Sequence, residues 1–122
     1  MAKGKVLIVD DEAAFSTMLK DYLKTQGYEV SMATNHEDAI NSFRRNQPKV
    51  VILDFNMPIV TGEKFLPILQ TVNPLIRVIV ITGCLEEEVE DRFKGLGYFA
   101  FFEKANLSLE KVRDKVEEAL AY

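Results

Sequence analysis

Short apolar runs alternate with amphipathic stretches along the chain, and this alternation limits the folds that are open to it. Each run is followed by residues whose apolar side chains recur every three or four positions, as on one face of a helix. The runs that predict strands cover residues 5–9, 28–33, 49–54, 77–83 and 98–102. Strands that alternate with helices predict a parallel sheet with helices on both faces.

The helical stretches have recognisable ends. Thr34 or Asn35 can cap the second helix and Ser108 the last, because short polar side chains accept backbone N–H groups at a helix start. Gly27 follows the first helix where a left-handed residue commonly ends one. The stripes that predict the helices comprise Phe15, Met18, Leu19, Tyr22 and Leu23; Ala39, Ile40 and Phe43; Phe65, Leu66, Leu69 and Val72; Val89, Phe93 and Leu96; and Leu109, Val112, Val116 and Leu120.

The runs at 49–54 and 77–83 are apolar at consecutive positions, which is typical of strands buried on both faces. Five strand–helix units are too few to close a βα-barrel, so an open, doubly wound α/β sheet is expected. We predict right-handed crossovers and the strand order 2-1-3-4-5. The run at 28–33 alternates more than the others, which places it nearer an edge of the sheet.

The composition is that of one folded domain. The chain has 122 residues, of which 48% are hydrophobic and 28% charged. A single cysteine, Cys84, and a single histidine, His36, exclude a disulfide framework and a metal site built on those residues. The net charge of −4 argues against direct nucleic-acid binding, and no apolar run approaches the ~20 residues of a membrane helix. We therefore expect a cytoplasmic domain over residues 1–122, without membrane association or an output domain.

Ligands of open α/β sheets bind at the carboxyl ends of the strands, beside the switch in strand order. With the predicted order, this switch lies between the first and third strands, and acidic residues follow both of them. The polar residues at the strand ends are Asp10, Asp11 and Glu12, then Asp54, Thr82 and Lys104. Carboxylates, a hydroxyl and an amine are thus predicted to converge on one edge of the sheet.

Each of these residues also has an ordinary structural interpretation. Asp10 or Asp11 could cap the first helix, and Asp54 could be a turn residue. Thr82 could simply end a β-rich segment, and Lys104 could be a solvated loop charge. Because these interpretations would all have to coincide at neighbouring strand ends, we favour a binding site.

The chemistry of the cluster favours a divalent cation and a phosphoryl group. Carboxylates held close together repel one another, and Mg²⁺, which binds through one or two carboxylates plus phosphate, would relieve that repulsion. An aspartate oxygen is an established nucleophile in phosphoryl transfer. A lysine ammonium and a threonine hydroxyl can each hold a phosphoryl oxygen.

Four short motifs contain the polar strand ends: Val9-Asp10-Asp11-Glu12, Leu53-Asp54-Phe55-Asn56-Met57-Pro58 with Gly62, Ile81-Thr82-Gly83, and Phe101-Phe102-Glu103-Lys104. Together they resemble the receiver domain of two-component response regulators, over residues 6 to about 120. The resemblance implies a flavodoxin-like (βα)5 fold and a regulatory protein that is no enzyme, beyond its own Mg²⁺-dependent phosphorylation and dephosphorylation. It also implies a sensor histidine kinase or phosphotransfer protein as donor, and a downstream protein or tethered output domain as the responding partner.

The resemblance implies a role for each residue at a motif position. Asp54 matches the phosphoacceptor, and Lys104 matches the lysine that pairs with it and then with the phosphoryl group. Asp10 and Asp11 match the acidic pair that holds Mg²⁺ or Mn²⁺ together with Asp54, Asp11 directly and Asp10 through water. The backbone carbonyl of Asn56 matches a further ligand of the metal.

A conformational switch is implied as well. Thr82 matches the hydroxyl that moves toward the phosphoryl group, and Phe101 matches the aromatic ring that follows it. Phosphorylation is then expected to change the face formed by the fourth helix, the fifth strand and the fifth helix, which binds partners or a second copy. One position departs from the family pattern: Ala105 follows Lys104 where proline is usual, so we expect a trans peptide bond and a rearranged loop near Asn106.

Other functions are open to an α/β chain of this size. A haloacid-dehalogenase-like phosphatase needs a second acid two residues after its nucleophile, where Asn56 stands here. Flavin binding and a P-loop both need a phosphate-binding loop that the sequence lacks. A receiver-like module that is never phosphorylated is the remaining alternative, and the presence of Asp10, Asp54 and Lys104 argues against it.

Overall fold

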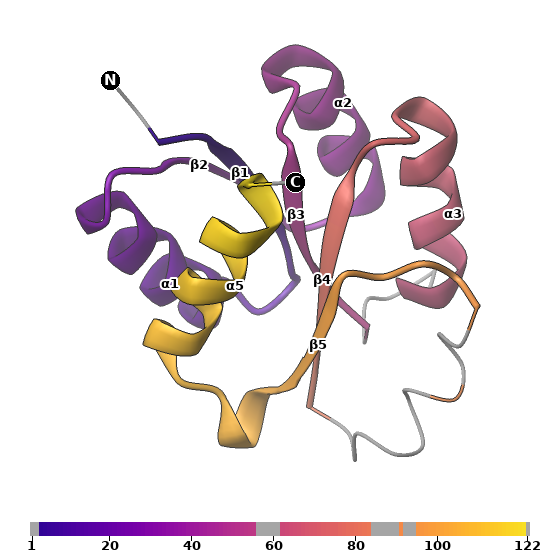
Figure 1. Cartoon of the computed structure of the whole chain (residues 1–122). Coiled ribbons are helices and arrows are strands. Elements are labelled where there is room, and N and C mark those ends of the chain that lie inside the picture. Colours follow the sequence, from indigo (N-terminus) through magenta and orange to yellow (C-terminus); the bar gives the residue numbers. More distant parts are fainter. Residues whose placement is uncertain (1–2, 56–61, 84–90, 92–94, 122) are drawn as a thin grey trace.

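A parallel sheet with helices on both sides forms the centre of the computed structural model, which describes residues 3–55, 62–83, 91 and 95–121 (Figure 1). The strands are β1 (Lys5–Val9), β2 (Glu29–Ala33), β3 (Val50–Asp54), β4 (Arg77–Thr82) and β5 (Ala100–Glu103). All neighbours pair in parallel, in the order β2-β1-β3-β4-β5. The predicted flavodoxin-like, doubly wound α/β topology is confirmed.

Helices cover both faces of the sheet. Those within the described residues are α1 (Ala13–Thr25), α2 (His36–Asn46), α3 (Gly62–Val72) and α5 (Leu109–Leu120), with the short 3-10 helix η1 (Lys104–Asn106). Helices α1 and α5 lie on one face, and α2 and α3 lie on the other (Figure 1). The predicted helix that carries Val89 and Phe93 lies outside the described residues. None of the described helices is both long and apolar enough to cross a membrane.

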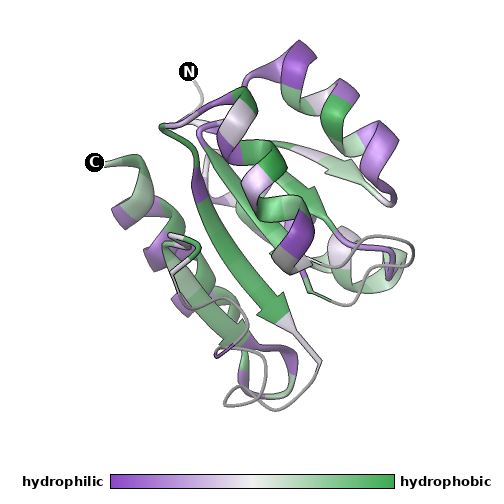
Figure 2. Cartoon of the chain, turned by 90° about the vertical axis from the view of Figure 1, so that its right-hand side faces the viewer, coloured by the Kyte–Doolittle hydropathy of each residue, from purple (hydrophilic) through white to green (hydrophobic). Residues whose placement is uncertain are grey.

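The core is divided by the sheet into two apolar layers. Alternate residues of each strand point to opposite faces, so Ile8 of β1 packs with α1 and α5 while Leu7 packs with the α2 and α3 side. All residues of β3 are buried. Figure 2 shows the central strands as mostly hydrophobic and the helices as a mixture of hydrophobic and hydrophilic residues. Burial on both faces therefore explains the consecutive apolar residues in the sequence.

Local signals mark the starts and the ends of helices as predicted. The side chain of Asn35 accepts the backbone N–H of Asp38 at the start of α2, and Ser108 accepts that of Lys111 at the start of α5. Gly27 has a φ of 96°, so it supplies the left-handed residue after α1.

The fifth strand and two helix stripes differ from the prediction. Strand β5 begins at Ala100 rather than at Tyr98, because its pairing with β4 begins where Ala100 lies opposite Ile79. Met18 and Val72, which were expected on the inner faces of α1 and α3, are 48% and 41% exposed. Met18 lies at the margin of its apolar stripe, whose central positions reach the sheet. Val72 is the last residue of α3.

Candidate functional site

Three aspartates meet where the neighbouring strands β1 and β3 end. One carboxylate oxygen from each of Asp10, Asp11 and Asp54 lies within 4.8 Å of the others. Asp10 is fully buried and Asp54 is 2% exposed, whereas Asp11 is exposed. The cluster is therefore built from two buried carboxylates and opens to solvent on the side of Asp11.

Hydrogen bonds of the turn between β1 and α1 hold Asp10 in place. Its backbone N–H donates to the carbonyl of Ala33 at 3.1 Å, which continues the pairing of β1 with β2. Its Oδ1 atom accepts the backbone N–H of Glu12 at 2.8 Å, and Glu12 is the residue that precedes α1. Asp10, rather than Asp11, thus organises the start of the helix, and it does so with one of its two carboxylate oxygens.

The ammonium group of Lys104 lies among the carboxylates. Its Nζ atom is 2.9 Å from Oδ2 of Asp10, 3.6 Å from Oδ2 of Asp54 and 3.5 Å from Oε1 of Glu12. Burial by itself lowers the pKa of Lys104, but Asp10, Asp54 and Glu12 outweigh burial, so the pKa is raised above the ordinary lysine value. Lys104 is therefore positively charged at neutral pH, and its ion pairs lose their stabilising effect only in alkaline solution, as the pH rises through this raised pKa.

The second oxygen of Asp10 faces the cluster. Oδ2 is buried, and the described group beside it is the Lys104 ammonium, with Nζ 2.9 Å away. One ammonium faces three carboxylates within 4.8 Å of one another, so negative charge exceeds positive charge at the cluster. An all-oxygen set from Asp10, Asp11 and Asp54 suits a hard divalent cation, so the residues present fit Mg²⁺ or Mn²⁺.

Lys104 is held by contacts that need no proline after it. Its Nζ atom lies 4.6 Å from the centre of the Phe15 ring, where a cation is attracted by the face of the ring. The peptide bond from Lys104 to Ala105 is trans, as predicted, and η1 follows directly. In that turn, Nδ2 of Asn106 donates to Oε2 of Glu103 at 2.7 Å.

Thr82 and Phe101 lie on the same face of the sheet. Thr82 is fully buried at the end of β4, and the alternation of side chains places it on the face of Val80, toward α2 and α3. Phe101 of β5 lies opposite Val80 in the register and packs against the same apolar layer. Its ring also meets that of Tyr98 edge to face, at 5.7 Å.

The structure thus brings together the predicted site residues Asp10, Asp11, Asp54 and Lys104, and Asn56 lies outside the described residues. Sequence reasoning did not assign Phe15 to the site, since its helical spacing indicated only the core of α1. The spacing of Phe15, three residues after Glu12, could have indicated a place above the strand ends, because residues three apart share a helix face.

A doubly wound sheet with aspartates and a lysine at the carboxyl ends of its strands is the arrangement that the motifs predicted. The sequence profile of the response regulator receiver domain matches residues 6–117. The chain therefore belongs to the receiver domain family of two-component response regulators.

Individual relatives are similar over different shares of their length. The chain is 29% identical over 120 residues to sporulation initiation phosphotransferase F of Bacillus subtilis, and this match covers 98% of this chain and 96% of that protein. It is 36% identical over 91 residues to the probable transcriptional regulatory protein TcrX of Mycobacterium tuberculosis, and this match covers 75% of this chain but 38% of that protein. Among solved structures, a response regulator receiver domain protein from Clostridium thermocellum matches with a TM-score of 0.88 and 25% identity, over 97% of this chain and 94% of that one.

Proposed function

We propose that Asp54 accepts a phosphoryl group from a phosphohistidine of a sensor histidine kinase or phosphotransfer protein. The observation that carries this proposal is the buried Asp54 carboxylate at the end of a central strand, with Nζ of Lys104 3.6 Å away. An oxygen of Asp54 attacks phosphorus, and the new O–P bond forms as the P–N bond of the donor breaks. The donor imidazole leaves with the electron pair of that bond and takes up a proton from solvent.

The surrounding residues have separate tasks in this transfer. Asp11, Asp54, the carbonyl of Asn56 and, through water, Asp10 would hold Mg²⁺ or Mn²⁺, which when bound neutralises charge on the carboxylates and the phosphoryl oxygens. Oδ1 of Asp10 is engaged by the N–H of Glu12, so Oδ2 is the oxygen that faces the cluster. The ammonium group of Lys104, charged at neutral pH, pairs with the Asp54 carboxylate before the transfer and with a phosphoryl oxygen after it.

The chain acts in this proposal as a reversibly modified switch and not as an enzyme with a separate substrate. The only reactions it promotes are its own phosphorylation and dephosphorylation. Asn56 argues against a phosphatase of the haloacid dehalogenase type, because such an enzyme would need an acid at this position, two residues after its nucleophile.

The proposal is tested by incubating the chain with a small phosphodonor such as acetyl phosphate and Mg²⁺, and measuring the intact mass. We expect the mass to rise by a single phosphoryl group, and a chelator of divalent cations to prevent the rise, because the carboxylates then repel the anionic donor. A mass that stays constant with Mg²⁺ present, or that rises equally in the chelator, would contradict the proposal. A constant mass would favour an interaction module that is never phosphorylated.

We further propose that phosphorylation acts through Thr82 and Phe101. A phosphoryl group at Asp54 adds strong acceptor oxygens at the strand end, which draw the Thr82 hydroxyl toward them and leave space for the Phe101 ring. This biases a two-state equilibrium at the face expected from the predicted fourth helix, β5 and α5, where a downstream protein, a tethered output domain or a second copy docks. The shared sheet face of Thr82 and Phe101 supports the coupling.

Phe101→Ala is expected to leave phosphorylation of Asp54 intact and to remove the conformational response of β5 and α5. Truncating the ring deletes the group that responds to Thr82 without touching the acidic cluster. The measurement is amide hydrogen exchange along residues 100–120 with and without phosphodonor. Phe99→Ala is the matched control, because this neighbouring ring packs against the opposite apolar layer, beside α1 and α5. If the phosphodonor changed the exchange of Phe101→Ala as much as that of the unaltered chain, the switch assignment would be wrong.

A further inference from the structure

The amino ends of the strands, opposite the aspartate cluster, carry a row of cations. Lys5 begins β1, Lys49 directly precedes β3, and Arg77 begins β4. The backbone N–H of Lys49 donates to the carbonyl of Lys5 at 3.2 Å, and the N–H of Arg77 donates to that of Lys49 at 3.1 Å. Neighbouring parallel strands lie about 4.8 Å apart, so Lys5 and Lys49 stand at matching strand starts. Arg77 lies opposite Val50, one position beyond Lys49 in the register.

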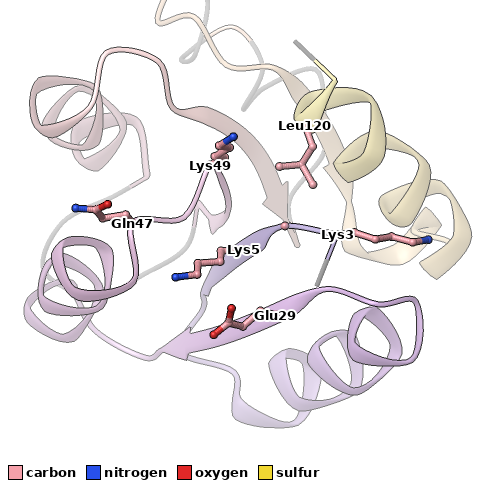
Figure 3. A pocket seen from close by; sticks show the side chains of 7 residues that line it. Lys3, Lys5, Glu29, Gln47, Lys49 and Leu120 are labelled. Carbon is pink, nitrogen blue, oxygen red and sulfur yellow. The ribbon is translucent and has the colours of Figure 1, made fainter. Parts of the chain in front are cut away.

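The surface is hollowed on both sides of Lys49. One hollow of about 450 Å³ lies between Lys5, Gln47, Lys49 and Leu120 (Figure 3). A second of about 450 Å³ continues from Gln47 and Lys49 to Val72, and a third of about 220 Å³ continues from Lys49 and Leu120 to Arg77. Lys49 lines all three hollows, and the surface that they form around it is here called the basic groove.

The central cations of the basic groove are not neutralised within the described part of the chain. Lys5 and Lys49 are exposed, and no described carboxylate forms an ion pair with either ammonium group. Glu29 lies opposite Lys5 in the register and is the carboxylate among the lining residues of the hollows. Lys3 extends away from the other lysines in Figure 3, and its ammonium lies over the ring of Tyr28 at 5.8 Å. A concentration of positive charge in a chain of net charge −4 favours an anionic partner there.

We propose that the basic groove docks an acidic segment of a partner protein, in which carboxylates flank an apolar side chain. A row of cations along several strands suits an extended ligand better than a compact anion, which needs cations that converge. Apolar side chains lie among the cations: Leu120 lines the first and third hollows, and Leu75, which also lines the third, is 78% exposed. Single-stranded nucleic acid would in addition require exposed rings for stacking, and the described lining residues include no exposed aromatic ring.

This docking site is separate from the proposed phosphoacceptor. Lys5 begins β1 and Lys49 directly precedes β3, whereas Asp10 and Asp54 stand at the other ends of the same strands. A partner held in the basic groove therefore leaves the aspartate cluster open to a phosphodonor. Binding is expected to be independent of phosphorylation and to weaken as salt screens the charges.

The test is a titration of the chain with the fluorescent peptide Glu-Asp-Leu-Glu-Asp, followed by polarisation and by amide chemical shifts. Binding should saturate, with the largest shifts around Lys5, Lys49 and Leu120. Lys49→Glu should weaken binding by about tenfold or more, because it places a carboxylate where all three hollows meet. Lys111→Glu is the matched control, since it reverses the charge of another exposed lysine, outside the groove, and should change affinity by less than about twofold.

Three results would overturn the proposal: binding that does not saturate, equal weakening by the two substitutions, or tighter binding of a single-stranded oligonucleotide than of the peptide. A peptide with glycine in place of leucine should bind more weakly, because it lacks the apolar anchor; equal binding would contradict the apolar part of the proposal. Phosphorylation of Lys49→Glu by acetyl phosphate and Mg²⁺ should be unchanged. Failure of docking is thereby distinguished from failure of the phosphoacceptor.

Discussion

Asp54→Asn is expected to abolish phosphorylation by acetyl phosphate and Mg²⁺. The amide has nearly the shape of the carboxylate, but it lacks the negative charge that makes the oxygen a nucleophile and attracts the cation. The fold should remain, because Nζ of Lys104 keeps its closer contact with Asp10, at 2.9 Å compared with 3.6 Å for Asp54. The intact mass after incubation gives the result directly, since the unaltered chain gains a phosphoryl group and the variant gains none.

The control for this prediction is Glu12→Gln, which makes the same acid-to-amide change beside the same lysine. Oε1 of Glu12 lies 3.5 Å from Nζ of Lys104, but Glu12 is exposed and lies outside the aspartate cluster. We expect this variant to be phosphorylated at close to the normal rate. An undiminished mass gain in Asp54→Asn would show that another residue accepts the phosphoryl group. Loss of phosphorylation in both variants would mean that the charge of the pocket, and not a particular nucleophile, is decisive.

Leu69→Ala is expected to produce the largest loss of stability among the conservative substitutions considered. Leu69 lies on α3, is fully buried, and packs in the apolar layer between that helix and the sheet. Removing a buried leucine side chain costs about 2–5 kcal/mol through lost transfer energy and the cavity left behind. Because small domains have an unfolding free energy of about 5–15 kcal/mol, this is a large share of the total. Urea unfolding monitored by circular dichroism should show a much lower midpoint at an unchanged slope.

Leu75→Ala provides the matched comparison, because the same atoms are removed from a side chain that is 78% exposed. We expect its free energy of unfolding to change by less than about 0.5 kcal/mol, as for most surface substitutions. Similar losses in the two variants would contradict the assignment of Leu69 to the core.

The architecture of the sheet could be predicted because its signals are local. Residues 5–9 and 50–54 are apolar at nearly every position, and this alone indicates strands that helices cover on both faces. Asn35, Ser108 and Gly27 mark helix ends through hydrogen bonds and dihedral angles that involve only residues within a few positions. The strand order then followed from general rules of chain connection rather than from any single residue.

Features that depend on neighbouring strands were harder to predict. The start of β5 depends on where β4 offers backbone partners, and no signal within residues 98–103 marks it. The exposure of Met18 and Val72 depends on how far α1 and α3 reach across the sheet, which an apolar stripe does not reveal. The row of Lys5, Lys49 and Arg77 is likewise invisible in the sequence, because these residues are tens of positions apart and become neighbours only through the parallel register.

The aspartate cluster combines both kinds of information. From the sequence alone, Asp10, Asp11, Asp54 and Lys104 could be placed at the carboxyl ends of their strands, since parallel strands all end at the same edge of a sheet. Only the tertiary structure decided that Oδ1 of Asp10 holds the start of α1 while Oδ2 faces Lys104, and that Phe15 lies beneath that lysine. The physical reason is range: strand and helix patterns arise from interactions between nearby residues, whereas the partner of each oxygen depends on distances of a few ångströms between segments that meet only in the folded chain.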